Sequence, residues 1–160
     1  HCGYTDYKFV IPTVETTDKY IRNETSKWET KPEIVPSGQR YDIYSKTYVA
    51  IAASGTVSAE LAMMHVPAII VYKMNRVTTL IARLLIRVRW VSLVNILLNR
   101  GVYPELLGSD ANINNIMNEF CHLIVPSVRE KMIQDLQQAD KMWRKNNTDA
   151  GQIIAESIMQ

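Results

Sequence analysis

The chain contains few of the residues that define several common classes of protein. Its 160 residues include two cysteines, Cys2 and Cys121, which lie far apart in the sequence. This excludes a disulfide framework and a cysteine cluster with the spacing of metal ligands. Six glycines and six prolines form no repeat and no low-complexity tract. The cysteine usage favours a reducing, cytoplasmic setting.

The chain also lacks a long unbroken hydrophobic run and a strong charge of one sign. Its most apolar region, 77–98, is interrupted by three arginines and an asparagine, which argues against a transmembrane helix. The formal net charge of +2 is too small to indicate nucleic acid as a partner. Because the chain begins with His1 and shows no signal peptide, we expect it to be a piece of a longer protein.

Short strands alternate with helices along the chain. Hydrophobic residues make up 47%, enough for one folded domain with a core. Apolar runs bounded by turn residues predict strands at 7–11, 33–35, 48–51, 68–72 and 90–93. Helical spacing predicts helices at 16–28, at 39–45, after residue 56, at 77–88 and from 112 onwards, with breaks near 126 and at 146–151. This order predicts an α/β fold with a doubly wound parallel sheet and a helical C-terminal tail.

The most informative segment is 52–62, which reads Ala-Ala-Ser-Gly-Thr-Val-Ser-Ala-Glu-Leu-Ala. It joins a predicted strand to a helix, and a second strand follows. The unpaired N–H groups and the positive dipole end of such a helix suit a phosphate beside Ser54, Gly55 and Thr56. Glu60 lies one helical turn after Thr56 and can accept hydrogen bonds from sugar hydroxyls. Spacing alone equally allows an ordinary turn in which Thr56 caps the helix.

A second polar segment, 95–105, follows the strand predicted at 90–93. Asn95 can pair with amide or hydroxyl groups, and Arg100 can bind phosphate in bidentate fashion. Glu105 can orient Arg100 or meet a hydroxyl. Because ligands bind at the carboxyl ends of parallel strands, this segment is a candidate part of the site. A surface loop with a solvated arginine explains the same residues.

Arginines follow one stripe of the helix predicted at 77–88. Arg76, Arg83 and Arg87 are spaced by seven and four residues, and Arg89 flanks them. A basic stripe beside apolar residues suits an anionic membrane surface or an acylated, phosphate-bearing substrate. A helix that packs on the sheet and has a solvated outer face fits the pattern as well.

Four of these segments together resemble one enzyme family. They are 48–62, Tyr-Val-Ala-Ile-Ala-Ala-Ser-Gly-Thr-Val-Ser-Ala-Glu-Leu-Ala; 66–72, Val-Pro-Ala-Ile-Ile-Val-Tyr; 91–95, Val-Ser-Leu-Val-Asn; and 104–107, Pro-Glu-Leu-Leu. In this combination the chain resembles lipid-A-disaccharide synthase, in order, from about Tyr7 to the C-terminus.

The resemblance implies the C-terminal half of a GT-B fold, in which two Rossmann-like halves enclose the active site. It implies an inverting glycosyltransferase of lipid A biosynthesis in a Gram-negative bacterium. That enzyme joins UDP-2,3-diacylglucosamine to 2,3-diacylglucosamine 1-phosphate and releases UDP and lipid A disaccharide 1-phosphate. It works as a peripheral protein on the inner, cytoplasmic face of the membrane.

Carried onto this sequence, the resemblance assigns residues to the donor and to the membrane. The donor-binding residues are Ser54, Gly55, Thr56, Glu60, Tyr72, Asn95 and Arg100. The surface for the membrane or the acylated substrate is formed by Arg76, Arg83, Arg87 and Arg89. Residues 1–110 are then a UDP-sugar-binding domain that is incomplete at its N-terminus. Residues 111–160 are helices that complete it and reach towards the absent N-terminal half or another subunit, as in a homodimer.

The sequence departs from the family at several places. Val94 and Asn99 stand where the family often has proline and glycine. The family's Pro-Gly-Ser-Arg loop and its N-terminal half, with a proposed catalytic carboxylate, have no counterpart here. We therefore expect a donor-binding half that is inactive alone and has no catalytic residue of its own. Since no Asp-x-Asp pair is present, we expect donor binding without a metal or other cofactor.

Two other functions fit the same residues. One is a different GT-B enzyme that uses UDP-N-acetylglucosamine, such as a peptidoglycan precursor transferase or an epimerase. The other is a non-catalytic module that binds a membrane surface through the arginines at 76–89. A product assay with acylated and unacylated UDP-glucosamine distinguishes the first from a lipid-A-disaccharide synthase. Tight binding to anionic vesicles without any affinity for a nucleotide would identify the second.

Overall fold

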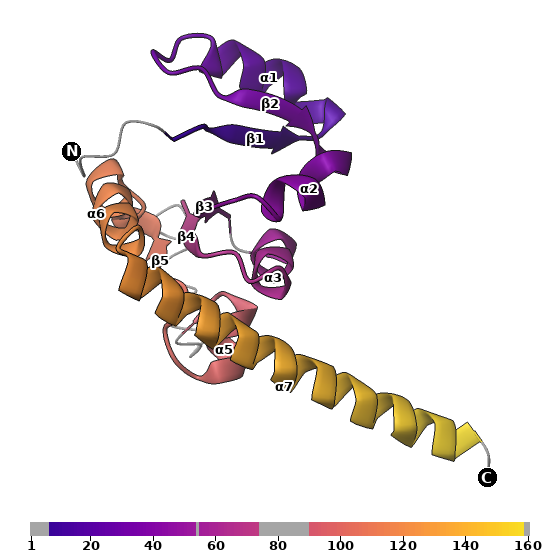
Figure 1. Cartoon of the computed structure of the whole chain (residues 1–160). Helices are drawn as coiled ribbons and strands as arrows, with labels where there is room; N and C mark the ends of the chain where they lie inside the picture. The colour runs from indigo at the N-terminus through magenta and orange to yellow at the C-terminus, as the bar shows by residue number, and fades with distance from the viewer. Residues whose placement is uncertain (1–6, 54, 74–89, 159–160) are drawn as a thin grey trace. The chain divides into compact units, whose positions relative to one another are not determined.

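The protein is built from two groups of parallel strands and their helices (Figure 1). The computed structural model describes residues 7–53, 55–73 and 90–158, with side chains up to residue 145. Contacts divide the chain into two compact units, His1–Thr47 and Tyr48–Gln160. Strands alternate with helices in both, which confirms the predicted α/β class.

The first unit is a β-α-β arrangement followed by a short helical segment. Strand β1 (Val10–Thr13) pairs in parallel with β2 (Glu33–Pro36), and α1 (Glu15–Thr25) connects them. A 3-10 turn, η1 (Ser37–Gln39), leads into α2 (Arg40–Tyr44). The predicted strand at 33–35 and helix at 39–45 are therefore confirmed.

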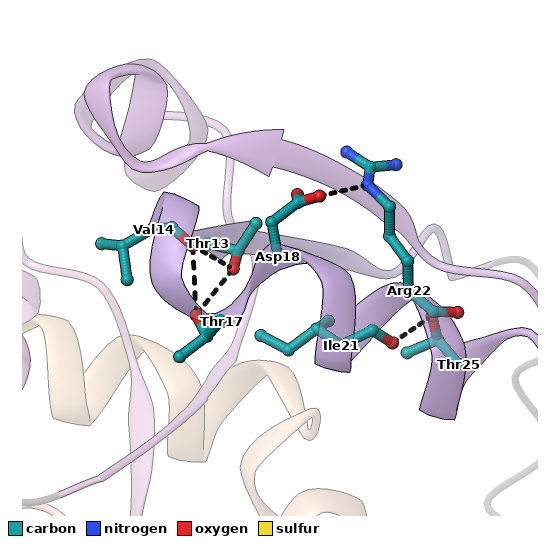
Figure 2. Close-up of polar contacts among 7 residues, drawn as sticks. All are labelled: Thr13, Val14, Thr17, Asp18, Ile21, Arg22 and Thr25. Carbon is teal, nitrogen blue, oxygen red and sulfur yellow. Dashed lines mark hydrogen bonds and ion pairs between the residues drawn. The ribbon is translucent and has the colours of Figure 1, made fainter.

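Helix α1 begins one residue earlier than the sequence indicates. Its N-cap is the extended Val14, whose carbonyl accepts the N–H groups of Thr17 and Asp18 at 3.0 Å each. The hydroxyls of Thr13 and Thr17 lie 3.0 Å apart and bond to each other (Figure 2). Although threonine is a common N-cap, neither Thr16 nor Thr17 caps this helix, because both lie within it and the Thr17 hydroxyl donates back to the Val14 carbonyl.

The second unit contains a three-stranded parallel sheet in the order β3-β4-β5. The strands are β3 (Ala50–Ala52), β4 (Ala68–Tyr72) and β5 (Glu105–Leu107). Helix α3 (Thr56–Met63) connects β3 to β4, which confirms the predicted strand–turn–helix–strand unit. The central strand β4 is fully buried at Ala68, Ile69 and Ile70, as its unbroken apolar run predicts.

Three further helices surround this sheet. Helix α5 (Leu93–Leu98) precedes β5, and a 3-10 turn, η2 (Gly108–Asp110), follows β5. Helices α6 (Ile113–Leu123) and α7 (Pro126–Ile158) end the chain, and α7 is the long orange-to-yellow helix of Figure 1. Helix α7 packs against α3, α5 and α6. The most deeply buried apolar side chains of the unit include Leu61, Ile69, Ile70, Tyr103, Leu123 and Leu136.

The last strand of the sheet is not where the sequence places it. A strand was expected at 90–93, but Leu93 begins helix α5, and the third strand of the sheet is β5, later in the chain. The apolar residues around Leu93 form too short a segment for its period to distinguish a strand from a buried helix. Strand β5 has only three residues, and its pairing with β4 defines it.

Two other boundaries also differ. Pro12 lies inside β1 rather than closing the strand, because a strand edge tolerates a residue without an N–H. Helix α7 continues through 146–151, where a break was expected. The asparagines and the glycine there are weak helix formers, but only proline removes a helical hydrogen bond. The break near Pro126 is confirmed, since α6 ends at Leu123.

Several predictions fall on residues that the structure does not describe. They are the helix at 77–88, Ser54, and the arginines Arg76, Arg83, Arg87 and Arg89. The boundary between 1–110 and 111–160 also stays a prediction, although α6 and α7 belong to the same unit as β3, β4 and β5.

Cys121 on α6 is disulfide-bonded, which the cysteine spacing did not predict.

Candidate functional site

The candidate site is the edge of the sheet where β3, β4 and β5 end. Because the three strands are parallel, their carboxyl ends lie at one edge of the sheet. This edge carries the turn after β3, the last residue of β4, Tyr72, and the first residue after β5, Gly108. Tyr72 is 44% exposed there. Ligands of open α/β sheets bind at such an edge.

Gly55 gives the turn after β3 a conformation that other residues do not adopt. Its φ of 125° and ψ of −150° lie in a region that is essentially restricted to glycine. A Cβ built at Gly55 meets no atom within 4 Å, so steric crowding does not explain the glycine. The backbone angle alone requires it. The space beside the turn is left open.

The cap of α3 tests the interpretation in which Thr56 caps the helix. Gly55 is the N-cap, and Thr56 is the first residue of the helix, so Thr56 does not cap it. A glycine has no side chain to accept the first N–H groups of the helix. The N–H and the hydroxyl of Ser58 both donate to the Gly55 carbonyl, at 3.1 and 2.6 Å, and the N-cap residue makes no side-chain hydrogen bond to the helix.

Glu60 and Thr56 lie on one face of α3. Thr56 is exposed and Glu60 is partly buried, one helical turn further along. The carboxylate therefore lies near the turn, on the helix that begins there. Of the seven predicted donor-binding residues, the structure brings Gly55, Thr56, Glu60 and Tyr72 to one edge, and it does not describe Ser54.

Asn95 lies elsewhere, inside the protein. It is 0% exposed on α5. Its Oδ1 accepts the N–H groups of Val102 and Tyr103, at 2.8 and 2.9 Å. Its Nδ2 donates to the Tyr103 carbonyl and to Oε1 of Glu105, both at 2.8 Å. The amide thus makes all four of its hydrogen bonds within the chain, and it holds the segment that leads into β5.

Glu105 and Arg100 also bond to neighbouring elements. The Glu105 carboxylate accepts the N–H groups of Val91 and Ser92, at 2.9 and 2.8 Å, just before α5. A carboxylate at this end of a helix is favourable because the helix dipole is positive there. Arg100 donates to Asp135 and Gln138 of α7, at 2.9 and 2.8 Å. All three residues precede or begin β5 in the sequence, and none of these bonds reaches Gly55, Thr56, Glu60 or Tyr72.

Tyr103 is a supporting residue that the sequence did not single out. It is 1% exposed, and its hydroxyl donates to the Val66 carbonyl at 2.8 Å. Burial raises the pKa of Tyr103 well above its ordinary value, so the hydroxyl stays a donor. Tyr103 is followed by Pro104 and belongs to no periodic apolar pattern, so the sequence did not indicate that its hydroxyl would be buried and bonded.

A cavity of about 490 Å³ lies beside β5, and Gly55 is not among the residues that line it. Its walls come from Trp90, from Gly101 to Glu105 and from residues of α6 and α7 that include His122 and Lys131. None of the described residues that are predicted to bind the donor lines it. In the part of the chain that is described, no three histidine, cysteine, aspartate or glutamate residues gather as metal ligands. Metal-independent binding stays a prediction.

A sequence model of the family described as lipid-A-disaccharide synthetase matches residues 3–157. The chain belongs to this family. Among curated relatives, the lipid-A-disaccharide synthase of Rhodospirillum centenum is 32% identical over 165 residues, which cover 98% of this chain and 39% of the relative. The Paramagnetospirillum magneticum enzyme is 37% identical over 123 residues, 76% of this chain and 32% of the relative.

The match extends beyond bacteria. A probable mitochondrial lipid-A-disaccharide synthase of Arabidopsis thaliana is 28% identical over 141 residues, 86% of this chain and 31% of the relative. The chain thus spans about two-fifths or less of the length of these relatives. Among its described helices, none is long and apolar enough to cross a membrane.

Proposed function

We propose that this chain is the donor-binding part of a lipid-A-disaccharide synthase. The whole enzyme would join UDP-2,3-diacylglucosamine to 2,3-diacylglucosamine 1-phosphate, with inversion, and release UDP and lipid A disaccharide 1-phosphate. The observation that carries the proposal is the glycine-only turn at Gly55, which opens α3 at the carboxyl edge of the sheet in a chain of this family.

The diphosphate of UDP is proposed to lie at the start of α3. The first N–H groups of the helix point out of its N-terminus, and the helix dipole is positive there. As the bond between the sugar and UDP breaks, negative charge grows on the diphosphate, and fixed dipoles stabilise it. The acceptor hydroxyl attacks the anomeric carbon, and its proton leaves to a base that we do not assign to this chain.

The rest of the donor is proposed to lie along the same edge. Glu60 accepts hydrogen bonds from the ribose hydroxyls, one helical turn after Thr56. Tyr72 is exposed at the end of β4 and borders the nucleotide. Asn95 and Arg100 support the site indirectly. Asn95 holds the segment that leads into β5, and Arg100 bonds to α7.

The remaining partners follow from the family and belong to the same proposal. The arginines at 76, 83, 87 and 89 are proposed to bind anionic lipid or the acylated substrate. The protein then works as a peripheral protein on the inner face of the cytoplasmic membrane. Helices α6 and α7 complete the donor domain and reach another part of the enzyme or a second subunit.

A pair of nucleotides tests the Glu60 assignment in the full-length protein. UDP and 2′-deoxy-UDP differ by one ribose hydroxyl. Calorimetry should show that the wild type binds UDP at least about tenfold more tightly than 2′-deoxy-UDP. Without the hydroxyl, the carboxylate that accepts its hydrogen bond is left without that partner. In Glu60→Ala this preference should fall to about twofold or less, while both nucleotides still bind.

Glu119→Ala is the matched control, since Glu119 is a partly buried glutamate on α6. It should keep the full preference for UDP. An unchanged preference in Glu60→Ala would refute the assignment of Glu60. No UDP binding by the wild type would refute the donor-binding function itself.

A further inference from the structure

The start of helix α3 is held from within by a buried serine. Ser58 is 2% exposed, and its hydroxyl donates to the Gly55 carbonyl at 2.6 Å. Its N–H donates to the same oxygen at 3.1 Å. One residue therefore bonds twice to the carbonyl of the N-cap residue, where the helix begins.

Two other serines make the same kind of bond in a different setting. The hydroxyls of Ser26 and Ser45 donate to the carbonyl three residues before them, at 2.7 and 2.8 Å. Both serines are exposed, and each directly follows the last residue of a helix. Ser58 is instead buried in the first turn of its helix. Its bond therefore acts on the geometry of a helix start and not on a solvated helix end.

The carbonyl of Gly55 and the N–H of Thr56 belong to one peptide group. The bond between the two residues is trans, so the group is planar and its oxygen and hydrogen point in opposite directions. A bond that holds the oxygen towards Ser58 therefore turns the Thr56 N–H the other way. That N–H then points out of the N-terminus of α3, where the first helical N–H groups have no partner within the helix.

Gly55 needs such a restraint because its backbone is free to rotate. Glycine has the widest choice of backbone conformations, and the φ of 125° and ψ of −150° found here are sparsely populated. The space that a Cβ would occupy is open, so packing does not hold the turn on that side. The two bonds from Ser58 supply the restraint.

We infer that Ser58 is a positioning residue for the diphosphate of the nucleotide. It acts through the Gly55 peptide group, which it orients so that the Thr56 N–H faces the phosphate. The inference rests on the proposed function, because it requires a phosphate at the start of α3. A donor that is oriented before binding loses less freedom when the ligand arrives. Ser58 should therefore affect the affinity for the phosphate part of the nucleotide and not for the nucleoside part.

Ser58→Ala in the full-length protein tests the inference, with UDP and uridine as ligands. Both ligands contain the same nucleoside, and only UDP carries phosphate. In calorimetric titrations, Ser58→Ala should bind UDP about fivefold more weakly than the wild type does, because it lacks the hydroxyl that fixes the turn. Its affinity for uridine should change by less than about twofold.

Ser45→Ala is the matched control, since it removes an exposed hydroxyl that makes a bond of the same kind. It should leave the affinities for UDP and for uridine unchanged. A loss of UDP affinity in this variant equal to that in Ser58→Ala would overturn the inference, because the effect would not depend on the bond to Gly55.

The remaining outcomes separate the role of Ser58 from the proposed function. If the wild type binds UDP no more tightly than uridine, the proposed position of the diphosphate and the role of Ser58 are both wrong. If the wild type prefers UDP and Ser58→Ala keeps that preference in full, the role of Ser58 alone is wrong. Equal losses for both ligands in Ser58→Ala also overturn it, because a general loosening of α3 then accounts for the effect.

Discussion

Asn95 is the residue whose role the structure changes most. An asparagine after an apolar run suggests a polar group that faces a ligand, but this one is 0% exposed. Sequence gives residue type and spacing, and it does not show which backbone groups lie within reach. The four bonds of Asn95 join residues 95, 102, 103 and 105, a closed loop that no periodic pattern reveals.

Replacing Asn95 with aspartate should strongly destabilise the protein. The new side chain would place a buried carboxylate against the Glu105 carboxylate and the Tyr103 carbonyl, where Nδ2 of Asn95 now donates at 2.8 Å. We expect the free energy of unfolding to fall by about 3 kcal/mol or more, measured by urea denaturation. Asn99→Asp is the control, because Asn99 is exposed with a φ of 48° that aspartate tolerates. Similar small losses in both variants would contradict this role for Asn95.

At the scale of elements, the strand–turn–helix–strand unit was predictable and the segment after it was not. Buried β4 has five consecutive apolar residues with a proline before them, so its position follows from the sequence. Helix α5 and β5 depend on contacts between distant residues, chiefly Glu105 with the backbone before α5. The predicted strand at 90–93 was wrong because Leu93 begins α5 and Glu105 accepts the N–H groups of Val91 and Ser92 just before it.

Packing of an indole ring on a glycine fixes the loop between α5 and β5. A Cβ at Gly101 would lie 2.9 Å from Cη2 of Trp90 and 3.2 Å from its Cζ3. Gly101→Ala should therefore cost about 1–3 kcal/mol of stability, because the ring must move. Adding Trp90→Leu to Gly101→Ala should recover part of this loss, which denaturant midpoints of the single and double variants will show. Purely additive losses would show that the ring is not the cause.

At the scale of the whole molecule, family membership was recognisable from sequence because its motifs follow in order from Tyr48 to Leu107, and the match to 3–157 confirms it. Fold class also followed, since alternating strands and helices leave few other arrangements. The positions of the residues predicted to bind the donor were only partly foreseeable from the sequence. Gly55, Thr56, Glu60 and Tyr72 share an edge because parallel strands end there, whereas Asn95 and Arg100 were assigned to it through a strand that does not exist.

Binding of UDP by Gly55→Ala and Gly38→Ala variants of the full-length protein tests the central claim most directly. Neither added methyl group meets an atom within 4 Å, but only Gly55 has a positive φ, 125°. We predict that Gly55→Ala weakens UDP binding at least about tenfold in a calorimetric titration, since alanine cannot hold the turn that opens α3. Gly38→Ala should bind UDP as the wild type does. Equal UDP affinity in wild type and Gly55→Ala would contradict the account.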